Sequence, residues 1–281
     1  MHTRLFLDSG DPADTRILLS KDVLLAGQTT NPSLVAKNPA VVARVEAGDL
    51  FTTDEINGMY RGIVEEIAGL VEESVSIEVY ADLNTSADEM IAQAKEMNQW
   101  IPNAHIKLPT IPEGLHAANA LSDMGIKLNM TLCFTQQQAA AVYAATKGAP
   151  KGSVFLSPFI GRFDDKGQDG VSGVANIKRM FEVGDGHVEI LAASIRSQKH
   201  LMACYAMGVD IITAPTKVLE PWADDGHPMP GDEYVYDSGD LTEIQYEEID
   251  LEADWQSFDL SHQLVDEGVE KFVADWQKLL K

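Results

Sequence analysis

The sequence predicts an α/β protein built as a single (β/α)8 TIM barrel. Eight short apolar or β-branched runs alternate with longer segments of helical period, which is the pattern of repeated βα units. The length of 281 residues is ordinary for one such barrel, although it also admits two domains. No Gly-x-Gly-x-x-Gly follows the first run, which disfavours a doubly wound sheet.

The elements of the predicted barrel follow one another in order along the chain. Strands are expected at residues 4–8, 24–28, 75–79, 105–108, 127–131, 154–157, 188–193 and 209–213. Helices are expected at residues 53–71, 86–98, 136–146 and 197–207, with an additional helix within 38–49. The helix at 86–98 has the clearest start, because Ser86 is a good N-cap and Glu89 lies in the first turn.

The chain after the eighth strand departs from this pattern. Residues 220–258 are interpreted as an acidic extension, and 221–239 within it is rich in proline, glycine and aspartate, so an extended loop is expected there. Apolar residues then recur at helical spacing, which predicts a C-terminal helix over 261–281 across the outside or the mouth of the barrel. We interpret residues 1–281 as one barrel domain that carries these additions.

The net charge of −23 is concentrated in one segment. Residues 218–270 contain 17 Asp and Glu and no Lys or Arg, so the rest of the chain carries 27 acidic and 21 basic side chains. Nucleic acids and anionic membranes require basic surface, so neither is expected as a partner. We expect a solvated acidic loop, and a cation-binding role is the alternative.

Composition excludes several other classes of protein and site. No apolar run reaches the roughly 20 residues that cross a bilayer, and the first residues lack a signal-peptide pattern, so a cytoplasmic protein is expected. Cys133 and Cys204 lie in apolar stretches and are expected to be packed thiols. No zinc pattern is present, and residues 164–170 lack the glutamate of a calcium loop, so no metal or other cofactor is expected. The sequence does not determine the oligomeric state, and a homo-oligomer is one of the alternatives.

Polar side chains gather where the predicted strands end, which is where a barrel builds its active site. The ends and following loops carry Asp8, Asn31, Glu78, Lys107, Asn129, Thr131, Ser157, Arg162, Ser194 and Arg196. Residues two apart on a strand share a face, so Asn129 and Thr131 are expected to point into the barrel together. A lone lysine at a strand end is usually a surface residue, but Lys107 in this company is interpreted as an imine-forming nucleophile.

Seven stretches, in order, resemble the transaldolase family, which also contains fructose-6-phosphate aldolases. They are Leu7-Asp8-Ser9-Gly10, Thr29-Thr30-Asn31-Pro32-Ser33-Leu34, Ser76-Ile77-Glu78-Val79, Ile106-Lys107-Leu108-Pro109, Asn129-Met130-Thr131, Ser157-Pro158-Phe159-Ile160-Gly161-Arg162 and Ala193-Ser194-Ile195-Arg196. Glu78 and Phe159 are similar to the transaldolase branch, since the aldolase branch has glutamine and tyrosine there. The acidic extension is longer than the compact members lead us to expect.

The resemblance implies a catalytic set and a substrate-binding set of residues. The catalytic set is Lys107, Asp8, Glu78 and Thr131, and the substrate-binding set is Asn31, Asn129, Ser157, Phe159, Arg162, Ser194 and Arg196. Asp8 would take the hydroxyl proton beside the cleaved carbon–carbon bond, and Glu78 with Thr131 would move protons around a water. Arg162 and Arg196 would hold a phosphate, whose oxygens match the guanidinium fork.

The function that the resemblance implies is transfer of a dihydroxyacetone unit between sugar phosphates, without a cofactor. Sedoheptulose 7-phosphate and glyceraldehyde 3-phosphate would give erythrose 4-phosphate and fructose 6-phosphate, in the pentose phosphate pathway. Three alternatives stay open. They are an aldolase that releases free dihydroxyacetone, a transaldolase that acts on a sulfo-sugar, and a barrel that binds sugar phosphates without turning them over.

Overall fold

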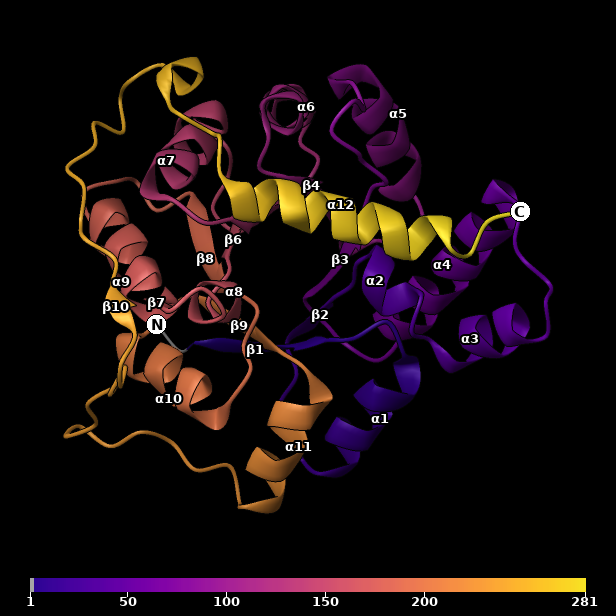
Figure 1. Ribbon diagram of the computed structural model, residues 1–281, viewed down its shortest axis with the longest axis horizontal. Helices are drawn as coiled ribbons and strands as arrows, with labels where there is room; N and C mark the ends of the chain where they lie inside the picture. Colours follow the sequence, from indigo (N-terminus) through magenta and orange to yellow (C-terminus); the bar gives the residue numbers. More distant parts are fainter. Residues whose placement is uncertain (1–2) are drawn as a thin grey trace.

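Eight parallel strands close into a barrel in the computed structural model, which describes residues 3–281 (Figure 1). In barrel order the strands are β1 (Arg4–Asp8), β2 (Gly27–Thr29), β3 (Ser74–Glu78), β4 (Ala104–Pro109), β5 (Leu128–Cys133), β6 (Val154–Pro158), β8 (Val188–Ala192) and β9 (Ile211–Ala214). β1 pairs with β9 and so completes the ring. The predicted (β/α)8 fold is confirmed.

The described residues form twelve α-helices, most of which surround the barrel on its outer side (Figure 1). They are α1 (Pro12–Ser20), α2 (Pro32–Val35), α3 (Pro39–Glu46), α4 (Thr53–Ala68), α5 (Ala87–Met97), α6 (Pro112–Asp123), α7 (Gln136–Ala145), α8 (Gly161–Asp164), α9 (Gly170–Phe181), α10 (Gln198–Met207), α11 (Thr216–Asp224) and α12 (Gln263–Gln277). The start of α5 is a capping box, in which Ser86 and Glu89 each accept a backbone hydrogen bond from the other. Within residues 3–281, no helix has the length and apolar character needed to span a bilayer.

Aromatic rings fill the interior of the barrel below the carboxyl ends of its strands. Phe6 and Phe155 meet edge to face at 6.1 Å, and His105 stacks on Phe155 at 4.0 Å. His105 is bonded to the Ser74 hydroxyl at 2.8 Å, and burial lowers the pKa of His105 to about 3. Alternate residues of β1, Leu5 and Leu7, point the other way into the main core between strands and helices. The polar residues of a site are therefore expected at the carboxyl ends of the strands.

Besides small differences at the ends of other elements, two expected elements begin later in the chain than the sequence predicts. The strand expected at 24–28 begins later, at Gly27, because the preceding apolar residues form a loop in which Leu24 is 90% exposed. The loop expected over 221–239 also begins later, since α11 continues to Asp224 with Pro221 inside it. Trp222 holds this helix end, because its indole donates a hydrogen bond to the Pro228 carbonyl at 2.8 Å.

The acidic extension runs along the outer helices α10, α9 and α7 (Figure 1). Its short strand β10 (Thr242–Glu243) pairs in parallel with β7 (Gln168–Asp169), and a 3-10 helix, η1 (Trp255–Ser257), follows near its end. Gln136 of α7 both donates to and accepts from the backbone of Glu247, at 2.9 and 2.8 Å. The backbone of the extension is thus anchored on the barrel, while most of its carboxylates face outward.

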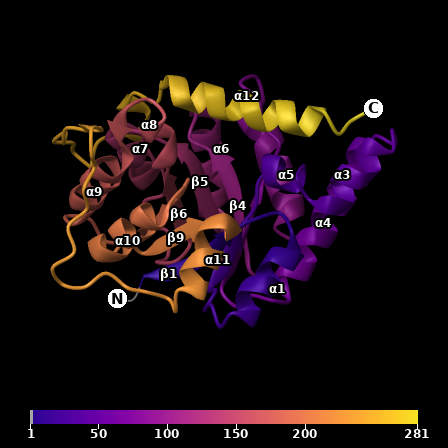
Figure 2. The same ribbon diagram turned by 60° about the horizontal axis from the view of Figure 1, so that its bottom comes forward.

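The C-terminal helix α12 lies across the mouth of the barrel (Figures 1 and 2). It covers Gln263–Gln277, which is shorter at both ends than the expected 261–281. Arg162 donates to the carbonyl of Leu264 at 3.4 Å, and Ser33 donates to Asp275 at 2.5 Å. Gly268 allows close contact, since a Cβ there would lie 2.6 Å from Leu132. The helix therefore forms one wall of the cavity described next.

Candidate active site

A cavity of about 220 Å³ opens at the carboxyl ends of the barrel strands. Most of the predicted site residues line it, namely Asp8, Asn31, Lys107, Ser157, Phe159, Arg162 and Ser194. Glu78, Asn129 and Thr131 are buried directly around these residues and are not part of the lining. Arg196 lies beside the cavity rather than in its lining. We refer to this space as the central cavity.

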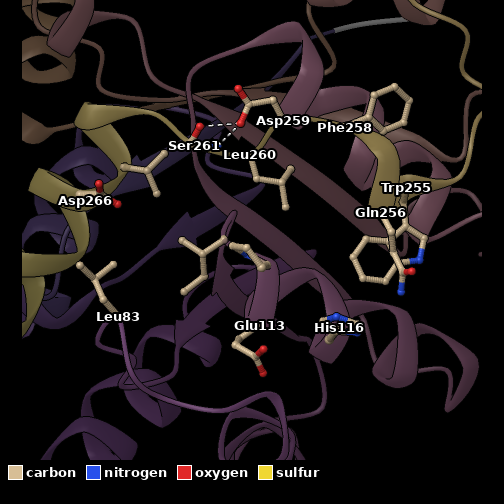
Figure 3. A pocket seen from close by; sticks show the side chains of 13 residues that line it. Leu83, Glu113, His116, Trp255, Gln256, Phe258, Asp259, Leu260, Ser261 and Asp266 are labelled. Carbon is tan, nitrogen blue, oxygen red and sulfur yellow. Dashed lines mark hydrogen bonds between the residues drawn. The ribbon is translucent and has the colours of Figure 1, made fainter.

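A larger groove of about 780 Å³ lies outside the barrel mouth, between α6, residues 255–261 and the start of α12 (Figure 3). Its lining includes Trp255, Phe258 and Leu83, and its carboxylates are Glu113, Asp259 and Asp266. No lysine or arginine is found among the residues that line this groove. An anionic sugar is therefore disfavoured there, and the smaller central cavity is the candidate active site.

Lys107 and Glu78 are held together by the pairing of β4 with β3, in which they are direct partners. Lys107 Nζ lies 3.1 Å from Glu78 Oε2 and donates to the Thr30 carbonyl at 3.3 Å. The two side chains are only 5% and 4% exposed. Burial raises the pKa of Glu78, and the ammonium of Lys107 acts in the opposite direction. The lysine thus has a proton acceptor within reach in a desolvated setting.

Asp8 ends β1 and lines the same cavity as Lys107. Its Oδ1 accepts a hydrogen bond from the Thr29 hydroxyl at 2.7 Å, and Thr29 is bonded in turn to Thr213 at 2.7 Å. Burial raises the pKa of Asp8, while the charge of Lys107 lowers it. A carboxyl group with a raised pKa in a cavity is suited to taking and returning a proton near neutral pH.

Asn31 and Ser157 form a polar part of the cavity lining, and Asn129 lies directly behind Ser157. Asn129 accepts a hydrogen bond from Ser157 at 2.6 Å and donates to Ser76 at 2.9 Å, so it fixes the serine hydroxyl beside the cavity. Asn31 caps α2, because its Oδ1 accepts from the Leu34 amide at 2.9 Å. The amide nitrogen of Asn31 is left to donate. These groups can bind hydroxyls of a small sugar.

Thr131 has a buried hydroxyl without a hydrogen-bond partner among the described residues. The strand that carries it is irregular, because its register against β6 shifts between Met130 and Cys133 and Leu132 has a φ of 60°. A left-handed conformation is uncommon for a branched residue, so the chain is held there by its surroundings. An unsatisfied buried hydroxyl is uncommon in a folded protein, and a bound ligand or water is one way to satisfy it.

The residues expected to hold a phosphate, Arg162, Ser194 and Arg196, are only partly brought together in the central cavity. Arg162 and Ser194 line it, and the Arg162 guanidinium lies 5.5 Å from the centre of the Phe159 ring. Burial lowers the pKa of Arg162, and the like charge of Arg196 lowers it further. Arg196 itself forms an ion pair with Asp165. The second guanidinium is therefore near the first but is held by a carboxylate.

Several lining residues were not predicted from the sequence. Thr29 and Thr213 support Asp8, and Lys37, Lys271 and Phe272 line the mouth. Thr29 stands in one of the stretches that carry the resemblance, so a signal for it was present. Lys37 lies on a turn, and Lys271 and Phe272 lie on α12, so only the placement of that helix brings them to the cavity.

Cysteine and metal-ligand chemistry has no group assembled for it in the described part of the chain. No cluster of three His, Cys, Asp or Glu within residues 3–281 is placed to hold a metal ion. Cys133 and Cys204 are buried free thiols, and burial raises the pKa of Cys204 to about 12. The central cavity instead presents amine, carboxyl, amide and guanidinium groups.

Comparison with known proteins places the chain among relatives of one family. The family model described as Transaldolase/Fructose-6-phosphate aldolase matches residues 5–281. A "Probable transaldolase" of Moorella thermoacetica is 33% identical over 277 residues, covering 98% of each chain. One of Desulforudis audaxviator is 39% identical over 225 residues, covering 80% of this chain and 91% of its own. A solved chain of the Pyrococcus furiosus tryptophan synthase complex aligns with a TM-score of 0.46 at 12% identity, covering 80% of this chain and 92% of its own.

Proposed function

Because this chain belongs to the transaldolase/fructose-6-phosphate aldolase family, we propose that it is a transaldolase that transfers a dihydroxyacetone unit through an imine on Lys107. The observation that carries this proposal is the buried Lys107, 3.1 Å from the carboxylate of Glu78 and in the same cavity as Asp8. An amine between two carboxyl groups has the acid–base partners that imine chemistry needs.

Imine formation is the first step of the proposed reaction. Glu78 accepts a proton from Lys107, and the neutral amine attacks the ketone carbon of the sugar to form a carbinolamine. The carbinolamine loses its hydroxyl group as water when Glu78 returns a proton to it, which leaves a protonated imine. The free hydroxyl of Thr131 can bind that water on the same side of the barrel. The same groups hydrolyse the imine at the end of the cycle.

Cleavage and transfer follow from the imine. Asp8 takes the proton of the hydroxyl on the carbon beyond the bond to be broken, and the carbon–carbon bond electrons move into the imine to give an enamine. The distal part of the sugar leaves as an aldehyde. The enamine then attacks the carbonyl of an acceptor aldehyde, and the new alkoxide recovers the proton from Asp8. Each proton that is removed is thereby returned.

Cations at the cavity mouth support an anionic substrate despite the net charge of −23. Three cations line the cavity, namely Arg162 of α8, Lys37 on the turn after α2 and Lys271 of α12. A phosphate at the end of an open-chain sugar would be bound by Arg162 with Ser194, while Asn31, Ser157 and Asn129 hold the hydroxyls of the dihydroxyacetone unit. The proposed substrates are the sedoheptulose and fructose phosphates of the pentose phosphate pathway. The proposed location of the protein is the cytoplasm.

Release of free dihydroxyacetone is the nearest alternative activity, because it uses the same imine and lets water complete the cycle. Glu78 favours transfer within the resemblance, since the aldolase branch has glutamine there. A sulfo-sugar substrate is a second alternative, because a guanidinium binds a sulfonate as well as a phosphate. Rates with a phosphorylated and a sulfonated ketose, each measured with and without an acceptor aldehyde, separate these activities.

Trapping with borohydride tests the proposal directly. The protein is incubated with fructose 6-phosphate and reduced, and the expected result is a dihydroxyacetone-derived mass on Lys107. Lys107→Met should abolish the adduct, while Lys127→Met should retain it, because Lys127 is exposed just before β5 at the other end of the barrel. If the wild-type protein gives no adduct, the covalent mechanism is wrong and a non-catalytic sugar-phosphate-binding barrel takes its place.

A further inference from the structure

We propose that Gly161 and Asp165 are positioning residues that seat Arg196 beside the central cavity and so set the preference for phosphorylated over unphosphorylated sugars. Neither residue touches the reacting atoms in the mechanism above. The inference rests on the proposed function for its substrate class, and it adds two residues that determine specificity at the anionic end of the sugar.

Asp165 holds the side chain of Arg196 at one end of its fork. The ion pair joins Arg196 Nη1 to Asp165 Oδ1, with the two side chains 40% and 54% exposed. Asp165 is the C-cap of α8, and α8 is the short helix that carries Arg162. A single bond to Nη1 leaves the other nitrogens of the guanidinium able to donate to a phosphate oxygen. The carboxylate therefore fixes Arg196 relative to Arg162 without using its whole fork.

Gly161 provides the space through which Arg196 passes. A Cβ on Gly161 would lie 2.6 Å from both Cγ and Cδ of Arg196, and the three atoms nearest to that Cβ all belong to Arg196. The backbone of Gly161 is fixed as well, because its amide donates to the Ser194 carbonyl at 3.0 Å. Only a residue without a side chain lets the arginine lie against the backbone directly beside Arg162.

The backbone of Arg196 is tied to the same short helix. The Arg196 amide donates to His200 Nδ1 at 3.4 Å, and His200 Nε2 lies 2.8 Å from the carboxylate of Asp164. Because Nδ1 accepts that bond, Nε2 carries the proton and donates to Asp164. Neighbouring carboxylates, Asp164 and Asp165, thus hold the backbone and the side chain of Arg196 against α8.

Charge balance explains why a carboxylate is needed beside two arginines. Arg196 lowers the pKa of Arg162, and Asp165 acts in the opposite direction on the same group. Two adjacent guanidiniums repel each other, so without Asp165 the exposed Arg196 would move toward solvent. A phosphate dianion can join the two forks, whereas an unphosphorylated sugar gains nothing from them. Asp165 and Gly161 should therefore affect one substrate class selectively.

Two variants and two readouts test this inference. Asp165→Asn and Gly161→Ala are compared with wild type for the dissociation constant of inorganic phosphate by calorimetry. They are also compared for the ratio of kcat/KM for fructose 6-phosphate to that for fructose. We expect Asp165→Asn to raise the dissociation constant of phosphate and to lower the kcat/KM ratio, each by about two- to five-fold, the range of an exposed ion pair. Gly161→Ala displaces the whole side chain of Arg196 and should change each quantity by about ten-fold in the same direction. The value of kcat/KM for fructose should stay unchanged in each variant.

Matched variants control for general effects of the substitutions. Asp224→Asn removes an equally exposed aspartate, 59% exposed and paired with Lys21, which lies outside the cavity lining. Gly62→Ala adds a methyl group to α4 at a position with no atom within 4 Å of the new Cβ. Neither should change phosphate binding. In an Arg196→Ala background, which removes the atoms that the new methyl group would meet, Gly161→Ala should produce no further change in either readout.

The inference is overturned if phosphate does not bind to the wild-type protein or binds equally well to both variants. It is also overturned if activity on fructose falls in proportion to activity on fructose 6-phosphate, or if Gly161→Ala still changes either readout in the Arg196→Ala background. Failure of the proposed function is distinguishable, because it appears as a missing borohydride adduct on Lys107 while the phosphate titration still reports on Arg196.

Discussion

Lys107 and Glu78 are direct partners across β4 and β3, and their side chains form an ion pair of 3.1 Å that is almost completely buried. Parallel pairing fixes their relative positions through backbone hydrogen bonds rather than through the flexible lysine stem. The carboxylate also receives the opposing influences of burial, which raises its pKa, and of the lysine charge, which lowers it. The pair is therefore a preorganised proton donor and acceptor at the base of the cavity.

Glu78→Gln should convert transfer partly into release. The amide keeps the shape of the side chain but cannot accept a proton from Lys107, so we expect the transfer rate to fall by about 100-fold. A larger share of the remaining turnover should yield free dihydroxyacetone. Product ratios with and without an acceptor aldehyde measure this. Glu189→Gln is the control, because Glu189 is a mostly buried barrel carboxylate paired with Arg4 near the other end of the strands. An unchanged transfer rate in Glu78→Gln would contradict the role.

Asp8→Asn should separate stability from activity through its pH dependence. Burial raises the folded-state pKa of Asp8 above its ordinary value of 3.8. The protonated carboxyl group therefore stabilises the folded state fully below pH 3.8, and this contribution is lost as pH rises through the raised pKa. The variant lacks an ionisable group and should be more stable than wild type at pH 7. This advantage should shrink as pH falls toward 3.8. Thermal unfolding at several pH values checks it.

Activity should show the reverse trend for the same residue. Asp8 must be ionised to take the hydroxyl proton, so kcat/KM of the wild type should fall as pH drops through the raised pKa, at higher pH than for an ordinary aspartate. Asp8→Asn should be inactive at every pH. A variant that is both less stable at pH 7 and active would show that Asp8 is a structural carboxylate instead.

Thr131→Val should lower activity without lowering stability. The Thr131 hydroxyl is buried and has no partner among the described residues, so its removal leaves no group newly unsatisfied. We expect a fall in kcat of about 10- to 100-fold with an unchanged unfolding midpoint. Thr110→Val is the matched variant, since the Thr110 hydroxyl donates to the Thr131 carbonyl at 2.8 Å. It should cost about 1 kcal/mol of stability. Equal unfolding midpoints in the two variants would argue against this distinction.

Gly268→Ala should loosen α12 from the barrel mouth. The new Cβ would lie 2.6 Å from Leu132 Cδ2 and 2.9 Å from Arg162 Nη1, which is overpacking. We expect a loss of about 1–3 kcal/mol in unfolding free energy and faster hydrogen exchange in α12. Gly62→Ala in the open part of α4 should instead gain about 0.5–1 kcal/mol. Unchanged exchange in α12 would mean that the helix adapts to the added methyl group.

The barrel itself could be predicted because each strand is a local signal. Short apolar runs that end in a polar residue, such as the one at Lys107, report both the strand and its functional end. The sequence predicts the strand near Gly27 too early, because an apolar strand and an apolar loop with an exposed Leu24 have the same local pattern. Pro221 predicts the beginning of a loop, but the short helix α11 accommodates this proline in its second half.

The parts of the cavity that could not be predicted depend on distant segments. Lys271 and Phe272 reach the cavity only because α12 crosses the mouth, and nothing in their own neighbourhood of sequence reports that placement. The ion pair between Arg196 and Asp165 joins residues on two separate loops, and the seat at Gly161 depends on a close approach of side chain to backbone. Such contacts between residues from separate segments depend on the tertiary structure, so no local sequence pattern predicts them.

The contacts that hold α12 across the mouth join segments that are far apart in the sequence. Leu264 receives a hydrogen bond from Arg162, and Asp275 receives one from Ser33. Contacts of this kind form only after long loops close, and that closure costs conformational entropy. We therefore expect the wall that α12 gives the cavity to form after the local βα units of the barrel during folding.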